Sequence, residues 1–162
     1  MKNKGERTIE DWACGFLGRR EHTRKELFLK LRKRGFAAGD IDFTLKKLEE
    51  AGLQDDSRFA RRWLEQALEK KTLGRSRLVA ELMKRGVEAG LARDVVEDEY
   101  PRDEEAGRLY QTALNQVRKK GLRRIEEALS RVGPFLARKG FHEEEIYKTL
   151  RRVMEQDQSL ED

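Results

Sequence analysis

Apolar residues recur every three or four positions along most of the chain, which is the period of an amphipathic α-helix. The stretch over residues 23–36 shows this pattern together with signals for a helix start and a helix stop. Thr23 is a suitable N-cap, and Glu26 is placed three residues later to complete a capping box. Gly35 follows basic residues and is expected to end the helix in a left-handed conformation.

The same pattern occurs three times. Gly35, Gly86 and Gly140 each follow an apolar helical stretch, and they are separated by 51 and then 54 residues. The only two tryptophans, Trp12 and Trp63, are also 51 residues apart. A helical period near 50 residues is typical of tandem modules, each of which is too small to bury its apolar face alone.

Each repeat is expected to contain three helices. Helices are predicted over residues 8–18, 23–35, 40–51, 76–85 and 91–99, and others begin after Asp55 or Asp56, at Pro101, near Ile125 and near Glu143. Asp40 is predicted to cap the third helix. The third repeat departs from the pattern at Gly133-Pro134, because proline lacks a backbone donor and clashes inside a helix, so a kink or a late start is expected there.

These patterns predict an all-α fold of tandem three-helix repeats, with three modules. The apolar fraction is only 37%, which favours an elongated stack with much surface per residue. Runs of Val, Ile and Thr that would indicate strands are absent from the sequence. The expected organisation is a flexible N-terminus over residues 1–8, repeats over residues 9–53, 54–100 and 101–155, and an acidic tail over residues 156–162.

Composition narrows the function classes. Cys14 is the only cysteine, so neither an intrachain disulfide nor a thiol metal site is expected. No apolar run reaches the roughly 18 residues that a membrane span needs. The basic N-terminus leads into no hydrophobic region and does not resemble a signal peptide, so the chain is expected to be cytoplasmic. A monomer is expected because no long heptad pattern occurs.

The search for catalytic chemistry finds no motif. His22 and His142 are the only histidines, and no phosphate-binding loop or nucleophile elbow is present. Asp55 and Asp56 form the best carboxylate pair, but adjacent helical residues point in different directions. They are interpreted as an N-cap and a buttress of the hinge between repeats, with a metal-dependent hydrolase as the alternative. No catalytic residue, metal or cofactor is predicted.

Basic clusters recur with the repeat, within a formal net charge of +5. They are candidates for contact with a phosphate backbone or an acidic protein surface. Cations that precede the repeat glycines can instead stabilise helix C-termini. Cations at helix starts face a positive dipole end, so a partner-binding role is favoured for them. The predicted partner-binding residues are Arg19, Arg20, Arg24, Lys25, Lys30, Arg75, Arg77, Lys84, Arg123 and Arg124.

Four aromatic residues are assigned to the core. Trp12, Phe36, Phe59 and Trp63 all fall on apolar helix faces. Stacking on nucleobases requires exposed rings beside cations. The sequence therefore predicts no stacking platform for single-stranded nucleic acid.

Three motifs resemble the RecX family of bacterial regulatory proteins. The run RREHTRKELFLKLRKRGF over residues 19–36 resembles the first-repeat signature of the family, and GLQDDSRFARRW over residues 52–63 resembles its L-x-D-D-x-x-F-A motif. The run GRSRLVAELMKRGV over residues 74–87 is similar to its second-repeat signature. The resemblance covers most of the chain, from about residue 12 to residue 154, and departs from the family at Gly133-Pro134.

The resemblance implies a curved arrangement of tandem three-helix repeats and a non-enzymatic role. It implies binding in the groove of the RecA nucleoprotein filament, with inhibition of ATP hydrolysis, filament extension and strand exchange. DNA is implied as a second contact, either weak or made through the filament. The alternative from the residues alone is a basic helical protein that binds DNA directly, although the many acidic residues argue against it.

Overall fold

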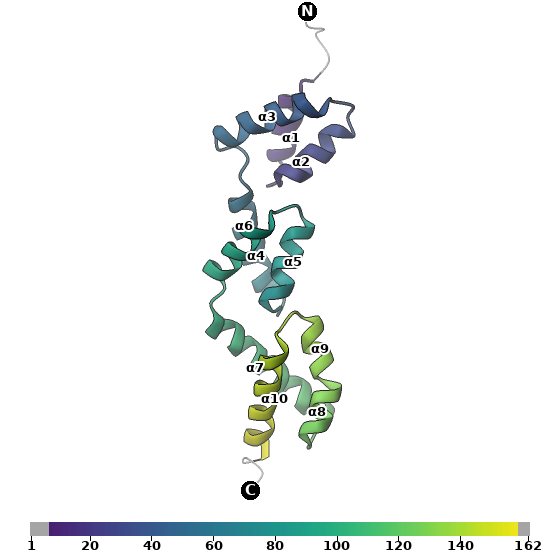
Figure 1. Cartoon of the computed structure of the whole chain (residues 1–162), viewed down its shortest axis with the longest axis vertical. Coiled ribbons are helices and arrows are strands. Elements are labelled where there is room, and N and C mark those ends of the chain that lie inside the picture. The colour runs from purple at the N-terminus through teal and green to yellow at the C-terminus, as the bar shows by residue number, and fades with distance from the viewer. Residues whose placement is uncertain (1–6, 159–162) are drawn as a thin grey trace, which may run out of the picture. The chain divides into compact units, whose positions relative to one another are not determined.

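A computed structural model describes residues 7–158, and within that range every regular element is a helix (Figure 1). The helices are α1 Ile9–Leu17, α2 Arg24–Arg32, α3 Ala38–Glu50, α4 Asp56–Lys70, α5 Arg75–Lys84, α6 Ala89–Glu99, α7 Arg102–Lys120, α8 Ile125–Arg131, α9 Gly133–Arg138 and α10 Glu143–Gln158. The predicted all-α fold is confirmed. Much of the predicted flexible terminus, residues 1–6, and the end of the predicted acidic tail, residues 159–162, lie outside the described residues.

The helix starts agree only in part with the sequence signals. Thr8 caps α1 through a complete capping box with Asp11. Thr23 caps α2, and its Oγ1 accepts a hydrogen bond of 3.1 Å from the backbone N–H of Glu26. The predicted return bond from Glu26 to Thr23 is wrong, because the Glu26 carboxylate pairs with Arg20 instead. The predicted cap at Asp40 is also wrong, since α3 begins at Ala38 and Asp40 lies in its first turn.

The helix stops agree with the sequence. Gly35, Gly86 and Gly140 have φ angles of 90°, 99° and 90°, respectively. This left-handed region clashes with the Cβ of other residues, which explains why glycine ends each of these helices. The stop signal of the repeat is therefore confirmed in all three copies.

The third repeat divides its middle helix in two. Helix α8 ends at Arg131, Val132 has φ −109° and ψ −35°, and α9 begins at Gly133 with Pro134 in its first turn. Proline is favourable there because the first N–H groups of a helix have no intrahelical partner. Gly133-Pro134 therefore starts a new helix instead of kinking the old one.

Buried apolar residues follow the predicted helical faces. The core of the first repeat contains Ala13, Leu27, Leu31, Ile41, Leu45 and Leu48. The core of the third repeat contains Leu109, Ala113, Val117, Leu122, Ala128, Val132, Leu136, Phe141, Ile146, Leu150, Val153 and Met154. In the second repeat, the buried positions include Phe59, Ala60, Leu64, Leu78, Leu82, Ala92, Val95, Val96 and Tyr100.

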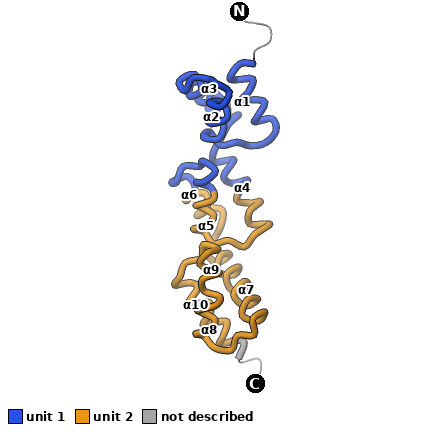
Figure 2. Tube along the Cα trace, turned by 90° about the vertical axis from the view of Figure 1, so that its right-hand side faces the viewer, with its two compact units in different colours: residues 1–63, 82–92 blue, residues 64–81, 93–162 orange. Residues whose placement is uncertain are grey.

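The chain forms two compact units, which Figure 2 shows in different colours. Unit 1 consists of residues 1–63 and 82–92, and unit 2 of residues 64–81 and 93–162. The boundary crosses α4, α5 and α6, so each unit takes part of the second repeat. None of the helices described over residues 7–158 combines the length and the apolar character that a bilayer crossing would need.

Candidate partner-binding surface

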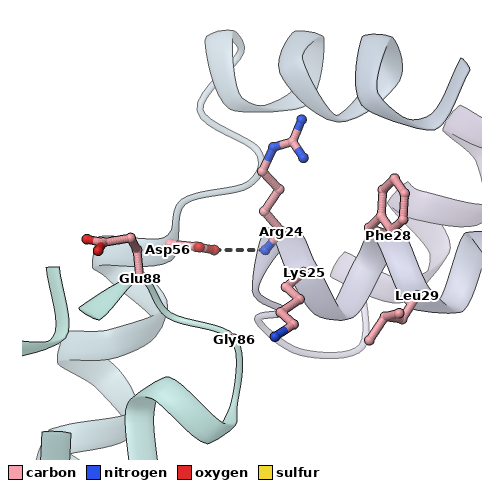
Figure 3. A pocket seen from close by; sticks show the side chains of 7 residues that line it. All are labelled: Arg24, Lys25, Phe28, Leu29, Asp56, Gly86 and Glu88. Atoms are coloured by element: carbon pink, nitrogen blue, oxygen red, sulfur yellow. Dashed lines mark hydrogen bonds between the residues drawn. The ribbon is translucent and has the colours of Figure 1, made fainter. Parts of the chain in front are cut away.

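The N-terminus of α2 is capped by residues far away in the sequence. Thr23 is fully buried, and its Oγ1 donates a hydrogen bond of 2.8 Å to the carbonyl oxygen of Arg85. The backbone N–H of Arg24 donates to Asp56 Oδ1 at 2.8 Å (Figure 3). Asp56 also accepts from the buried Gln54 side chain at 2.7 Å. These bonds attach the start of α2 to the start of α4 and to the turn after α5 within unit 1.

The turn at Gly86 lies directly against this helix start. A Cβ atom on Gly86 would be 2.8 Å from the Cβ of Lys25 and 2.9 Å from the Oγ1 of Thr23. Both distances are shorter than real Cβ contacts permit. Glycine is therefore required at this position by the close approach as well as by its φ angle.

Unit 2 repeats the same arrangement with different residues. The backbone N–H of Gly74 donates to the carbonyl oxygen of Lys139 at 2.8 Å, and that of Arg75 donates to Glu105 Oε1 at 2.8 Å. A Cβ atom on Gly140 would be 2.4 Å from the Cβ of Arg77. We call this arrangement the repeat joint: the glycine turn and one carboxylate of a repeat cap the middle helix of the repeat before it.

The two arginines at these helix starts hold ion pairs or hydrogen bonds inside their own repeat. Arg24 contacts Asp42 at 3.1 Å and Glu49 at 2.7 Å, and both carboxylates lie on α3. Arg75 donates to the carbonyl oxygen of Tyr100 at 2.8 Å and has a side chain that is only 13% exposed. The acceptors offset the unfavourable dipole at the helix start, so both arginines have a structural role that the sequence argument missed.

A second cluster surrounds the buried His22. Its Nδ1 lies 2.9 Å from the carbonyl oxygen of Arg20 and must donate there, because a carbonyl oxygen only accepts. Its Nε2 is then the acceptor for Lys30 Nζ at 2.8 Å. Burial lowers the pKa of His22, although the carbonyl of Arg20 and the nearby Glu26 oppose the shift. His22 is therefore neutral in the folded chain, and Lys30 is fixed by it.

Glu26 balances the cations of this cluster. Burial by itself would raise the pKa of Glu26, but the hydrogen bond from Arg20 and the charges of Arg20 and Lys30 outweigh it and lower the pKa. The contact with Lys30 is 3.5 Å long. Arg20 and Lys30, both predicted to bind a partner, are therefore held by intramolecular contacts.

The neutral state of His22 leads to a pH prediction. The unfolded chain binds a proton at His22 near the ordinary pKa of about 6.5, whereas the folded chain does so only at lower pH. Stability should therefore fall as the pH drops below about 6.5, by at most about 1.4 kcal/mol per pH unit from this residue. Urea unfolding at pH 7.5 and 5.5 measures the difference, which should shrink in His22→Gln.

The exposed His142 supplies the control for this measurement. His142→Gln should retain the pH dependence of the original sequence. An unchanged difference between the two pH values in His22→Gln would show that His22 is not the group responsible. The lower pH of 5.5 stays above the pH range in which protonation of Glu26 changes the stability, because the pKa of Glu26 is lowered.

The remaining predicted cations lie at the surface. Arg19, Lys25, Lys84, Arg123 and Arg124 are exposed. Arg77 pairs with Glu81 at 3.0 Å, and Arg124 with Glu126 at 3.6 Å. Unit 1 contains Arg19, Arg20, Arg24, Lys25, Lys30 and Lys84, and unit 2 contains Arg75, Arg77, Arg123 and Arg124.

The tryptophans reveal contacts that the sequence analysis did not anticipate. The guanidinium of Arg34 lies 3.8 Å from the ring centre of Trp12, and that of Arg85 lies 4.5 Å from the ring centre of Trp63. Both rings are half-buried. In the first two repeats, the arginine before the repeat glycine therefore covers the tryptophan of the same repeat. The sequence did contain a signal for these contacts, because the two arginines are 51 residues apart and so are the two tryptophans.

The other aromatic residues are buried to different extents. Phe59 is buried as predicted, but Phe36 is only half-buried, like the tryptophans. Phe43 and Tyr147 are exposed by 63% and 48%. Trp12 and Phe36 nevertheless pack against the core of the first repeat, and they are only half-buried because a ring at the edge of a small module is covered on one side only.

The carboxylate pair of the hinge has two separate structural tasks. Asp55 Oδ1 accepts from the N–H groups of Ser57 and Arg58 at 2.8 and 3.0 Å, and so caps α4. Asp56 caps α2, as described above. Over residues 7–158, no group of three His, Cys, Asp or Glu side chains is arranged to hold a metal ion. This geometry agrees with the interpretation of the pair as a cap and a buttress.

A groove lies beside the joint of unit 1. It has a volume of about 450 Å³ and is lined by Arg24, Lys25, Phe28, Leu29, Asp56, Gly86 and Glu88 (Figure 3). Leu29 is 52% exposed, although it lies next to the half-buried Phe28. Figure 3 shows Lys25 and Leu29 on one side of α2, whereas Arg24 extends away from them. The groove thus combines an apolar wall with an exposed cation.

Two segments of the chain match models of known protein domains. Residues 11–48 match the model of the first three-helix domain of RecX, and residues 55–96 match that of the second. The Regulatory protein RecX of Amycolatopsis mediterranei is 34% identical over 83% of this chain and 77% of its own length. That of Chlorobium phaeobacteroides is 35% identical over 60% of this chain, and the match spans 65% of its length, slightly less than two thirds.

A solved structure shares the fold. The crystal structure of RecX from Lactobacillus salivarius superposes with a TM-score of 0.82 and covers 90% of this chain and 94% of its own. The two sequences are 19% identical. Because the match covers 90% of this chain, it includes a large part of the third repeat, where the sequence departs from the repeat pattern.

Proposed function

Because this chain belongs to the RecX family of regulatory proteins, we propose that it binds the RecA nucleoprotein filament and restrains its ATP hydrolysis, extension and strand exchange. The family assignment is the observation that carries the proposal. The protein acts by binding and catalyses no reaction itself. This activity places it in the cytoplasm, in the control of recombination and DNA repair.

The repeat joints support a binding role. Each joint fixes the start of a middle helix through backbone hydrogen bonds, so the exposed cations beside it are presented from a rigid element. Lys25 lies beside one joint and Arg77 beside the other. Contacts that are weak individually become strong when linked modules engage one partner together.

Inhibition of the recombinase ATPase tests the proposal. We expect increasing amounts of the protein to suppress ATP hydrolysis by RecA on single-stranded DNA at amounts no greater than stoichiometric. Unchanged hydrolysis at a stoichiometric amount would contradict the proposal. Circular dichroism of the same sample establishes that the protein is helical.

Variants of the exposed cations test the predicted contacts. Arg19 and Lys84 belong to the predicted set, and neither has an ion-pair partner within residues 7–158. The double variant Arg19→Ala, Lys84→Ala should require several-fold more protein for half suppression, because loss of surface charge weakens binding to an acidic partner. The control Lys46→Ala, Lys148→Ala removes the same charge outside the set and should match the original sequence.

Direct DNA binding is the second candidate, favoured by a sequence pI of about 9.4. Under this alternative, the protein would bind naked DNA with a steep salt dependence. We expect weak binding to naked single- or double-stranded DNA at physiological salt. Tight binding there, without any effect on the ATPase, would favour the alternative.

A further inference from the structure

Leu29 lines the groove of unit 1 but is left exposed to solvent in the described chain. Leu29 is 52% exposed, and both Leu29 and Phe28 line the groove. Lys25 precedes Leu29 by four residues and Lys33, the C-cap residue of α2, follows it by four, so all three lie along one row of the helix. Both lysines are exposed. The exposed surface of α2 is therefore apolar at its centre, with a cation one turn away on each side.

The other polar groups of the groove are already occupied. Asp56 accepts from Arg24 N–H and from Gln54, and the Arg24 guanidinium is held by Asp42 and Glu49. Glu88 Oε2 accepts from the backbone N–H of Leu91 at 3.1 Å. In the part of the chain that the structure describes, neither Lys25 nor Lys33 has a hydrogen bond or ion pair from its ammonium group. Charge complementarity therefore calls for an anionic partner.

The exposed leucine distinguishes a protein partner from a nucleic acid. Contacts to phosphate and sugar come from cations and hydrogen-bond donors. They do not require an apolar side chain between the cations. An amphipathic acidic segment satisfies all three positions, because an apolar side chain can cover Leu29 and Phe28 while carboxylates reach Lys25 and Lys33. The equivalent residues of the second repeat are Ser76, Ala80 and Lys84, so the second repeat does not present this row.

We propose that the α2 row, consisting of Lys25, Leu29 and Lys33 together with Phe28, docks an acidic amphipathic segment of the recombinase polypeptide. This inference rests on the proposed function and deepens it, because it assigns one surface of the chain to the protein component of the filament and not to its DNA.

Leu29→Asp tests the inference, with Ala80→Asp as the matched control. Both substitutions introduce one negative charge at an exposed position of a middle helix, 51 residues apart. We expect Leu29→Asp to weaken binding to RecA filaments on single-stranded DNA by about tenfold or more, as for the loss of a central apolar anchor. Ala80→Asp should have little effect. Both variants should bind naked single-stranded DNA equally.

Cross-linking identifies the partner directly. A photoreactive benzoylphenylalanine at position 29 should cross-link to the RecA polypeptide in assembled filaments, and the same residue at position 80 should not. Cross-linking from position 29 to the DNA, or an equal loss of filament binding in the two Asp variants, would overturn the inference. If the original sequence binds filaments and Leu29→Asp binds equally well, only this inference fails. If the original sequence does not bind filaments, the proposed function fails as well.

Discussion

Gly140→Ala is expected to destabilise the protein by about 3 kcal/mol or more, whereas Gly35→Ala should cost only about 1–2 kcal/mol. Both glycines have a φ of 90°, so the strain of a left-handed alanine is common to both. The difference is the surroundings. A Cβ on Gly35 meets nothing within 4 Å, but a Cβ on Gly140 would lie 2.5 Å from the backbone nitrogen of Arg77.

The overlap at Gly140 cannot be relieved by a side-chain rotation. The clashing atoms include the backbone N and Cα of Arg77, which belong to the first turn of α5. The turn must therefore move away from the helix, and the hydrogen bond from Gly74 N–H to the carbonyl of Lys139 is lost with it. Urea unfolding followed by circular dichroism measures both variants under the same conditions.

A double variant tests whether the joint acts as one unit. A Cβ on Gly74 would lie 2.3 Å from the carbonyl carbon of Gly140, so Gly74→Ala disrupts the same contact from the other side. We expect the double variant Gly74→Ala, Gly140→Ala to cost less than the sum of the two single variants, because the first substitution already separates the surfaces. Equal costs for Gly35→Ala and Gly140→Ala would show that the joint is not formed in solution.

Asp56→Ala is expected to cost about 2–4 kcal/mol, compared with about 1 kcal/mol for Asp55→Ala. Asp55 accepts only from the first turn of its own helix. Asp56 accepts from the backbone N–H of Arg24 and from the side chain of Gln54, which is 2% exposed. Removal of the Asp56 carboxylate therefore takes the acceptor away from one backbone donor and one buried side-chain donor.

The conservative variant separates the lost hydrogen bonds from the lost charge. Asp56→Asn retains an acceptor oxygen and should recover more than half of the stability that Asp56→Ala loses. The free energy of unfolding from urea titration gives all three values. A cost for Asp55→Ala equal to that for Asp56→Ala would contradict the assignment of Asp56 as the cap of α2.

The sequence predicted the local features of the fold well. The helix stops at Gly35, Gly86 and Gly140 and the cap at Thr8 depend on neighbours within one turn, so the sequence alone contains the relevant information. The cap at Asp40 failed because α3 starts two residues earlier without any side-chain cap. Propensity favours aspartate at an N-cap, but packing of the apolar face decides where a helix begins.

The candidate site was less predictable, because charge alone does not show where a side chain is used. Arg24 and Arg75 occupy helix starts, where the dipole disfavours cations, and this suggested a free, functional role. Asp42, Glu49 and the carbonyl of Tyr100 approach them only after α3 and α6 have packed. The exposure of Leu29 was equally hidden, since Leu29 stands in a leucine-rich helix beside two fully buried leucines.

The sequence by itself determined the helical class, the repeat of about 50 residues and the glycine that ends each middle helix. Periodicity and backbone conformation set these features, and both act over a few residues. The tertiary structure alone decided that Asp56 and Glu105 cap helices of the preceding repeat, and which cations remain exposed. These outcomes depend on groups that are 30 or more residues apart in the sequence, and only packing brings such groups within hydrogen-bonding distance.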